Sequence, residues 1–241
     1  MEQNYNAYTI EDQQTWQLLF DKQKGNMAYA SQAYIDGVDL IGFNRDEIPR
    51  FSEMNEVLNN ATGWMVEVVP GWIPENTFFT LLFNRKFPSS TWLRSQDQLE
   101  YLEEPDMFHD VFGHVPLLTN QAFVDFLFEL SKLGLDYIDN EYALDLLSRV
   151  YWYTVEFGLI RENNELKIYG AGILSSSGET IYSVSDKPEH FEFSVPEIIS
   201  LPFRKDVFQT RYFIINSYDQ LYDSVAEIKT EIEKRCKPVH Q

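Results

Sequence analysis

Residues 104–116 read EPDMFHDVFGHVP and contain two of the four histidines of this 241-residue chain. His109 and His114 are five positions apart, whereas zinc peptidases carry His-Glu-x-x-His, which sets both rings on one helical face beside a general-base glutamate. On an ideal α-helix, residues five apart point about 140° away from each other. We therefore predict that the helix bearing His109 ends at Gly113 and that His114 returns on irregular backbone before Pro116. This spacing makes a zinc peptidase less favoured.

The stretch YWYTVEFG at residues 151–158 contains the best candidate for a third metal ligand, Glu156. It stands among aromatic and β-branched residues, where an ionised carboxylate is costly unless a cation or hydrogen bonds compensate it. Two neutral imidazoles and one carboxylate leave positions open on an ion, an arrangement associated with non-haem Fe(II) oxygenases. From spacing alone, a metal site and ordinary packing of these three side chains remain open alternatives.

Three motifs follow one another along the chain: EPDMFHDVFGHVPLL at 104–118, YWYTVEFGL at 151–159 and YGAGILSSSGE at 169–179. In this order they resemble the aromatic amino acid hydroxylases, in particular the bacterial members that act on phenylalanine. The resemblance runs from about residue 8 to residue 235. It implies a mainly α (α+β) catalytic fold with small β-hairpins, one domain over residues 1–241, and neither a regulatory domain nor a tetramerisation tail.

The resemblance also implies a cofactor pair. His109, His114 and Glu156 would hold Fe(II), and a tetrahydropterin beside the iron would supply electrons to O2. A pterin is a planar heteroaromatic that needs backbone partners along its edge and an aromatic face to stack on. The residues that the resemblance assigns to this cofactor are Gly71, Ile73, Phe78, Asp110 and Tyr151. Without the resemblance, Phe78 would be interpreted as helix core packing.

An amino acid substrate brings a carboxylate that suits a bidentate guanidinium and an apolar ring that suits an aromatic wall. The residues that the resemblance assigns to the substrate are Arg94, Pro105, Trp152, Gly172 and Ser175. Arg94 would bind the carboxylate, Ser175 would assist with its hydroxyl, and Trp152 would help shape the ring pocket. The chain departs from the animal enzymes at Leu102, where they carry a hydroxyl, and at Asp110, where they carry a glutamate.

The activity that the resemblance implies is hydroxylation of L-phenylalanine to L-tyrosine with O2. One alternative is the same machinery acting on tryptophan, tyrosine or another aromatic amino acid. Trp152 disfavours an indole substrate, because vertebrate tryptophan hydroxylases resemble this motif but have phenylalanine there. The other alternative is a zinc-dependent hydrolase or a non-catalytic metal-binding domain. It is less favoured, because no nucleophile or suitably spaced base stands in the motif.

The composition limits the partners. The net charge is −19, from 19 basic and 38 acidic side chains, which disfavours nucleic acid and anionic membrane surfaces. The single cysteine, Cys236, excludes an intrachain disulfide and fits a reducing compartment. The first residues lack the basic and apolar regions of a signal peptide, and no segment reaches transmembrane length. We expect a cytoplasmic monomer whose partners are a small-molecule substrate and the pterin.

Apolar periodicity and capping residues predict a mostly helical chain. One helix should run from a Thr9 cap to Gly25, and another from a Ser52 cap to Gly63. Further helices are predicted from 119 to Gly134, from about 140 to 157 and from about 217 to 235. Asn163-Asn164 should turn a hairpin between 158–161 and 166–169. The glycines of 170–172 form no phosphate loop, because the lysine of that motif is missing.

Overall fold

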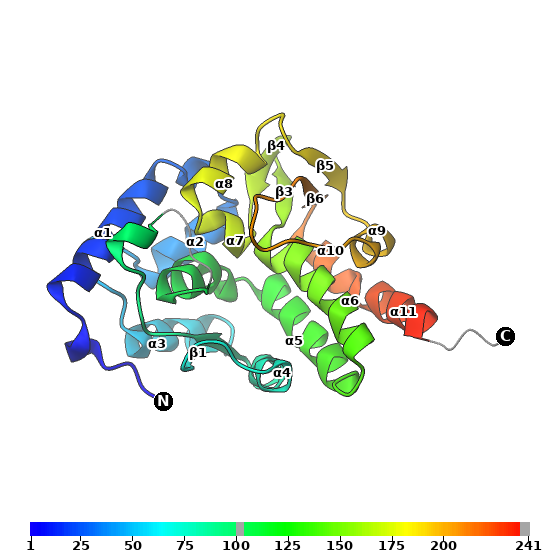
Figure 1. Cartoon of the computed structure of the whole chain (residues 1–241), viewed down its shortest axis with the longest axis horizontal. Coiled ribbons are helices and arrows are strands. Elements are labelled where there is room, and N and C mark those ends of the chain that lie inside the picture. Colours follow the sequence, from blue (N-terminus) through cyan, green and yellow to red (C-terminus); the bar gives the residue numbers. More distant parts are fainter. Residues whose placement is uncertain (100–103, 237–241) are drawn as a thin grey trace.

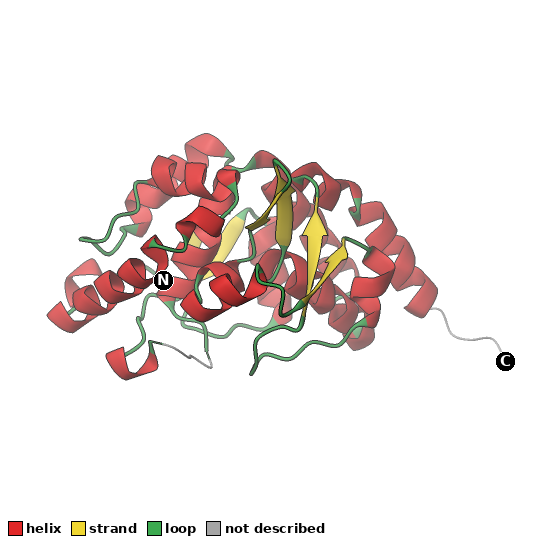
Figure 2. Ribbon diagram, turned by 90° about the horizontal axis from the view of Figure 1, so that it is seen from above, coloured by secondary structure: helices red, strands yellow, loops and turns green. Residues whose placement is uncertain are grey.

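The computed structural model describes residues 1–99 and 104–236, so Leu102 lies outside the described residues. Helices dominate and surround two small sheets (Figure 1, Figure 2). The α-helices are α1 Ile10–Lys24, α2 Gln32–Ile41, α3 Phe51–Ala61, α4 Glu75–Phe83, α5 Gln121–Asp136, α6 Glu141–Tyr151, α7 Ala171–Leu174, α8 Ser177–Ser183, α9 Val195–Ser200, α10 Tyr218–Asp223 and α11 Val225–Cys236. None of these helices is long and apolar enough to cross a bilayer.

The predicted start of the first helix is confirmed, and that of the second is wrong. The Thr9 hydroxyl accepts the Asp12 N–H at 3.1 Å while the Asp12 carboxylate accepts the Thr9 N–H at 2.7 Å, so the two residues form a capping box. In contrast, α3 begins at Phe51, and Ser52 does not cap it. The Phe51 N–H instead donates to the side-chain oxygen of Gln3 at 2.9 Å, a partner 48 positions away.

One predicted helix end and one predicted continuous helix are also wrong. α5 continues through Gly134 to Asp136. The Phe79 ring of α4 occupies the place that a side chain at Gly134 would take, since a Cβ there would lie 2.4 Å from that ring. The glycine therefore serves close helix packing and does not end the helix. The helix predicted over 217–235 is two helices, α10 and α11, which meet at Ser224. The Ser224 hydroxyl donates to the Leu221 carbonyl at 2.7 Å.

The predicted hairpin is confirmed, and it belongs to a larger sheet. β3 Leu159–Glu162 and β4 Glu165–Ile168 pair antiparallel, and Asn163 and Asn164 take positive φ of 51° and 64°, as a type I′ turn requires. β6 Arg211–Ile215 pairs parallel with β3, and β5 Glu189–Glu192 pairs parallel with β6, giving the order β4-β3-β6-β5. A separate parallel pair joins β1 Met65–Val68 to β2 Lys86–Ser89.

The segment that carries the two histidines is fixed in the aromatic core. Phe108 and Phe112 stack with their ring centroids 4.7 Å apart. Trp16 meets Phe108 edge-on at 5.4 Å, and Phe20 meets Phe112 edge-on at 5.8 Å, so α1 packs directly on this segment. The Tyr34 hydroxyl of α2 donates to the Phe112 carbonyl at 2.7 Å. Core packing on both sides therefore sets the position of His109 and His114.

Candidate active site

His109 and His114 lie on a π-helix, Phe108–His114, where the prediction placed a helix end at Gly113. That prediction is wrong. In a π-helix the backbone hydrogen bond joins residues five apart, so the two histidines are one turn apart and lie near each other on one side. Gly113 is needed for packing, since a Cβ there would lie 2.9 Å from the Ala171 carbonyl oxygen of α7.

Glu156 ends a second π-helix, Trp152–Glu156, which continues α6. The Phe157 N–H donates to the Trp152 carbonyl five residues earlier, at 2.9 Å. The glycine turn at 170–172 packs against this ligand segment: a Cβ on Gly170 would lie 2.4 Å from the Glu156 carbonyl oxygen, and one on Gly172 would lie 2.7 Å from the Phe157 ring. The YGAG stretch thus allows close contact with the backbone that presents Glu156.

The three predicted ligands converge. His109 Nε2 and His114 Nε2 are 3.3 Å apart, His114 Nε2 lies 3.3 Å from Glu156 Oε1, and His109 Nε2 lies 3.6 Å from Glu156 Oε2. Donors held at roughly 2.1 Å from one ion stand roughly 3.0–3.4 Å apart in octahedral or tetrahedral geometry. Within residues 1–99 and 104–236, they form the one group of three or more such side chains close enough to share an ion. The donor set therefore fits a metal.

The protonation states also suit a metal. Burial lowers the pKa of His109 to about 4, which keeps the imidazole neutral near pH 7. Burial alone would raise the pKa of Glu156, but the facing His114 and His109 lower it, so this carboxyl is ionised. A neutral imidazole and an ionised carboxylate are the forms that bind metal ions.

Ser175 orients His109. Its hydroxyl donates to the Ala171 carbonyl at 2.8 Å and lies 2.9 Å from His109 Nδ1. Because the hydroxyl proton is directed at Ala171, His109 donates its Nδ1–H to Ser175, and its Nε2 lone pair faces the other two ligands. Such an outer hydrogen bond fixes the tautomer and ring orientation of a ligating histidine. Contact of Ser175 with substrate stays a prediction.

The Asp110 side chain contacts the residue that follows β2. Its carboxylate accepts the Ser90 N–H at 2.8 Å, and burial raises its pKa to about 7 despite that hydrogen bond. The Val69 N–H donates to the Ser89 carbonyl at 2.9 Å, so strand pairing brings Val69, two residues before Gly71, beside this region. A pterin contact of Gly71, Ile73 or Asp110 stays a prediction.

The two aromatic residues assigned to the pterin touch each other. Phe78 of α4 and Tyr151 at the end of α6 meet edge-on, with centroids 5.4 Å apart. Tyr151 directly precedes the π-helix that ends at Glu156, so this aromatic pair lies beside the ligand segment along the chain. A pterin contact of either ring stays a prediction.

Arg94 has a buried partner that sequence reasoning missed. Its Nε and Nη2 donate to the two Asp106 oxygens at 2.9 and 2.7 Å, and the side chains are 7% and 0% exposed. Asp106 also accepts the His109 N–H at 3.1 Å. One edge of the guanidinium is thus bound to Asp106, and binding of a substrate carboxylate by Arg94 stays a prediction. Asp106 lies in the histidine motif, next to the exposed Pro105. Its position three residues before His109 was the feature of the sequence that could have indicated its importance.

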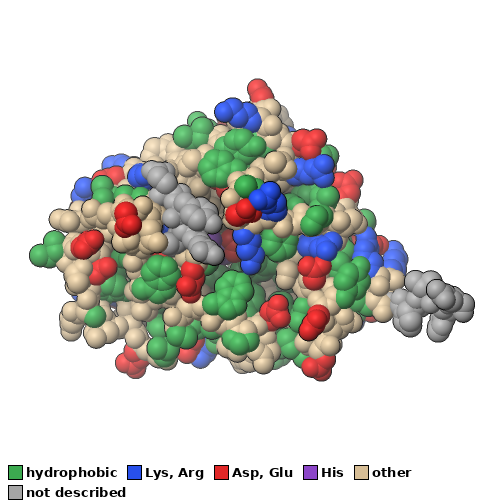
Figure 3. Space-filling view, viewed as in Figure 1, with side chains coloured by type: hydrophobic (Ala, Val, Ile, Leu, Met, Phe, Trp, Pro, Cys, Tyr) green, Lys and Arg blue, Asp and Glu red, His purple; other side chains and the backbone are tan. Residues whose placement is uncertain are grey.

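Trp152 forms an aromatic wall with two other rings. Its indole stacks on Phe203 at 4.4 Å and packs against Phe157 at 4.6 Å. The indole N–H donates to Gln209 Oε1 at 3.1 Å, a residue that sequence reasoning also missed. Figure 3 shows a central hollow with histidine at its floor and basic and hydrophobic side chains on its rim.

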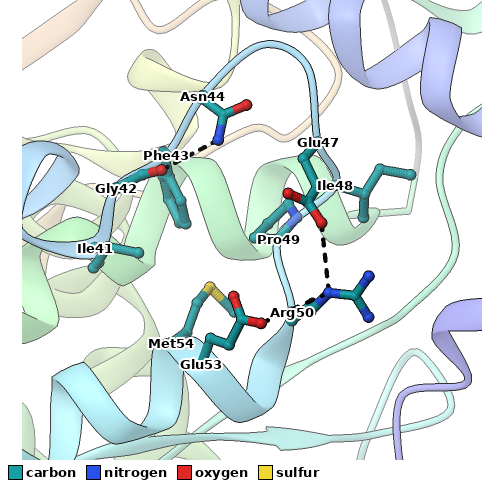
Figure 4. A pocket seen from close by; sticks show the side chains of 10 residues that line it. All are labelled: Ile41, Gly42, Phe43, Asn44, Glu47, Ile48, Pro49, Arg50, Glu53 and Met54. Carbon is teal, nitrogen blue, oxygen red and sulfur yellow. Dashed lines mark hydrogen bonds and ion pairs between the residues drawn. The ribbon is translucent and has the colours of Figure 1, made fainter.

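A second hollow lies elsewhere, between α2 and α3 (Figure 4). It is lined by residues 41–44, 47–50, 53 and 54 and has a volume of about 60 Å³. Ligand pockets typically hold roughly 300–1,000 Å³. It is therefore too small for an amino acid or a pterin, and no predicted site residue lines it.

Comparison with known proteins decides the family. The sequence profile of the biopterin-dependent aromatic amino acid hydroxylases matches residues 4–240. The chain belongs to this family. It is 46% identical over 226 residues to phenylalanine-4-hydroxylase of Ralstonia nicotianae, and the aligned region covers 93% of this chain and 72% of that protein. Membership in this family supports a metal site at His109, His114 and Glu156 more strongly than their spacing alone does.

Two crystal structures of the Chromobacterium violaceum phenylalanine hydroxylase share the fold. One has bound iron(III) and the oxidised cofactor 7,8-dihydrobiopterin, with a TM-score of 0.91 and 42% identity over 97% of this chain and 86% of that one. The other has bound iron and phenylalanine, with a TM-score of 0.92 and 40% identity over 99% of this chain and 87% of that one. The chain thus has the same fold as these hydroxylases, mainly helical with small sheets.

Proposed function

We propose that this protein is a tetrahydropterin-dependent, non-haem Fe(II) monooxygenase that hydroxylates L-phenylalanine to L-tyrosine with O2. The observation that carries the proposal is the convergence of His109, His114 and Glu156 within 3.3–3.6 Å of each other in a chain of this family. The relatives named phenylalanine-4-hydroxylase support phenylalanine as the substrate.

Three side chains would hold the iron. His109, His114 and Glu156 would hold Fe(II) on one side and leave its other positions open. When both are bound, the iron and the reduced pterin supply the chemistry that activates O2. Ser175 would keep the His109 Nε2 lone pair available to the ion, and the ionised Glu156 would balance part of its charge.

The remaining residues bind and orient the organic ligands. Arg94, held by Asp106, would present its other guanidinium edge to the substrate carboxylate. Trp152, together with Gly172 beside the Phe157 ring, would border the substrate ring. Phe78, Tyr151 and the loop that contains Gly71 and Ile73 would receive the pterin, with Asp110 near its edge. Pro105 would also line the substrate pocket.

The zinc hydrolase alternative is disfavoured by the family. The profile of the biopterin-dependent aromatic amino acid hydroxylases matches residues 4–240, and relatives that align with most of this chain are named phenylalanine-4-hydroxylase. The Asp110 carboxylate accepts the Ser90 N–H at 2.8 Å, and we place it near the pterin edge.

The direct test measures tyrosine formation by the purified protein loaded with Fe(II), supplied with a reduced tetrahydropterin, phenylalanine and O2. We expect one tyrosine per pterin oxidised, and none when pterin is omitted or when Zn²⁺ replaces Fe(II). Tryptophan and tyrosine are tested in parallel as substrates. Turnover with Zn²⁺, or a higher kcat/KM for tryptophan or tyrosine than for phenylalanine, would contradict the proposal.

We also propose that residues 1–241 act as one catalytic domain, as a monomer in the cytoplasm. The match over residues 4–240 supports the single domain, and the net charge of −19 supports the monomer, because like-charged copies repel one another. The lone Cys236 fits a reducing compartment. Light scattering after size-exclusion chromatography should give a mass near 28.3 kDa, and a dimer mass would contradict the monomer.

A further inference from the structure

Gln209 is buried in the loop between α9 and β6, and both polar atoms of its side-chain amide are hydrogen-bonded. Its Oε1 accepts the Trp152 indole N–H at 3.1 Å. Its Nε2 donates to the carbonyls of Arg204 and Val207 at 2.8 and 3.1 Å, and the residue is 6% exposed. The amide thus links the loop to the indole. The orientation of the amide is defined, because a 180° flip would swap Oε1 and Nε2 and break all three hydrogen bonds.

The backbone of Gln209 is fixed independently by Glu179, the last residue of the YGAGILSSSGE motif. Glu179 Oε1 accepts the Gln209 N–H at 3.0 Å and the Tyr212 hydroxyl at 2.7 Å. The Glu179 side chain is 5% exposed. A carboxyl buried in this way is costly unless its hydrogen bonds are made, so α8 holds Gln209 firmly in place.

The stacked rings leave one motion of the indole unrestrained. Contacts with Phe203 and Phe157 fix the plane of the Trp152 ring, but an aromatic ring can slide and turn within a stack at small cost. A hydrogen bond at the ring edge restrains that in-plane motion. Trp152 also begins the π-helix that ends at Glu156, so its orientation bears on the space beside the ligands.

We propose that Gln209 is a positioning residue that sets ring selectivity by holding the Trp152 indole at one orientation in the pocket wall. This inference rests on the proposed function, in which Trp152 borders the ring of the substrate. Glu179 fixes Gln209, Gln209 fixes Trp152, and Trp152 limits the size of the ring that reaches the iron. The chain of contacts joins α8, the loop 201–210 and the second π-helix.

The first test is Gln209→Met, which keeps the side-chain volume and removes all three bonds. We expect kcat/KM for tryptophan relative to phenylalanine to rise about 2- to 10-fold, the range that one lost hydrogen bond gives. The matched control is Tyr153→Phe, which removes the hydrogen bond from the Tyr153 hydroxyl to the Pro202 carbonyl of the same loop, 2.9 Å long, without touching Trp152. Its ratio should stay at the parent value. An equal change in both variants, or in neither, would overturn the proposal.

A second test removes only the indole donor, for use even if Gln209→Met does not fold. Replacing Trp152 by 3-benzothienylalanine puts sulfur in place of the N–H and keeps the ring size. The ratio should rise as in Gln209→Met, and Gln209→Met added to it should cause no further change. An unchanged ratio would overturn the proposal. The dissociation constants of the two amino acids, measured by calorimetry, should change in the same ratio, so the proposal remains testable even if the parent forms no tyrosine and the proposed function fails.

Discussion

The iron side and the wall side of the candidate site are built differently. His109, His114 and Glu156 sit on two π-helices whose positions are set by core packing, and two of the three ligands lie within five residues of each other. Trp152 is held by Gln209, 57 positions later in the chain, through a loop. The comparison teaches that the π-helical turns bring the candidate donors together, whereas the groups proposed to face the substrate are placed by side-chain hydrogen bonds to other parts of the chain. The following predictions test that division.

The largest effect should come from removing a ligand. His114→Ala and Glu156→Ala should each abolish tyrosine formation and reduce bound iron to a small fraction of the parent, because two donors hold the ion far more weakly than three. Iron is measured by mass spectrometry and the fold by circular dichroism. His190→Ala, which removes a histidine outside the site, is the control and should retain iron. Full iron occupancy in Glu156→Ala would remove Glu156 from the ligand set.

The Arg94–Asp106 pair should be the next most sensitive. Arg94→Lys keeps the charge but loses the fork, so KM for phenylalanine should rise by about 5- to 150-fold, equivalent to about 1–3 kcal/mol. The melting temperature should also fall, because the fully buried Asp106 loses one of its bonds. KM for the pterin should change little. Arg149→Lys, which alters an arginine paired with Asp145, is the control. A KM for phenylalanine within twofold of the parent would place the substrate carboxylate elsewhere.

A substitution at Ser175 tests whether iron binding depends on the hydrogen bond between Ser175 and His109 Nδ1. Ser175→Ala frees His109 Nδ1 and should weaken iron binding by about 10- to 100-fold, the usual cost of losing a partner of a ligating histidine. The variant Ser176→Ala removes the neighbouring hydroxyl, which caps α8, and serves as the control. Iron affinity is measured by competition with a chelator. If Ser175→Ala changes only KM for phenylalanine, the hydroxyl serves the substrate and not the ligand.

Trp152 tests the wall directly. Trp152→Phe enlarges the pocket and should raise kcat/KM for tryptophan relative to phenylalanine by roughly tenfold, because relief of steric exclusion favours the larger ring. Iron content should stay at the parent level, since no ligand changes. An unchanged ratio would mean that Trp152 is ordinary core packing.

The smallest effect concerns pH and Glu179. Burial raises the pKa of this carboxyl in the folded protein, so its contribution to stability is complete below the unfolded pKa and is lost as pH rises through the folded pKa. Glu179→Gln cannot ionise and keeps an acceptor for Gln209 and Tyr212. Its melting temperature relative to the parent should therefore increase between pH 4.5 and pH 8, by about 2–4 °C for each 1 kcal/mol. A difference that does not vary with pH would mean that Glu179 titrates normally.

The same division explains what the sequence could predict. The α1 cap and the Asn163-Asn164 hairpin depend on residues close together, and these predictions are confirmed. The three proposed ligands were named from motif resemblance and come together in the structure, and their binding of a metal stays a prediction. The start of α3 failed because its cap is Gln3, and the end of α5 failed because Phe79 needs the space at Gly134. Asp106 and Gln209 were missed for the same reason. Their importance comes from partners that only the folded chain brings near.

The histidine helix gave the most instructive error. An ideal α-helix does not bring positions five apart together, so a helix end at Gly113 was the simplest prediction. The wider π-helical turn brings the two histidines together without ending the helix. No composition signal in Phe108–His114 distinguishes this turn from an α-helix, because the aromatic packing of Phe108 and Phe112 on α1 stabilises it from outside.

The π-helical turns also matter to anyone who wishes to graft this site into a designed scaffold. De novo bundles are assembled from regular α-helices, which offer side-chain pairs at three or four positions' separation. Copying His109, His114 and Glu156 onto such helices would point the histidines in different directions. A graft would need one inserted residue in each ligand-bearing helix, together with aromatic neighbours that keep the widened turn from relaxing.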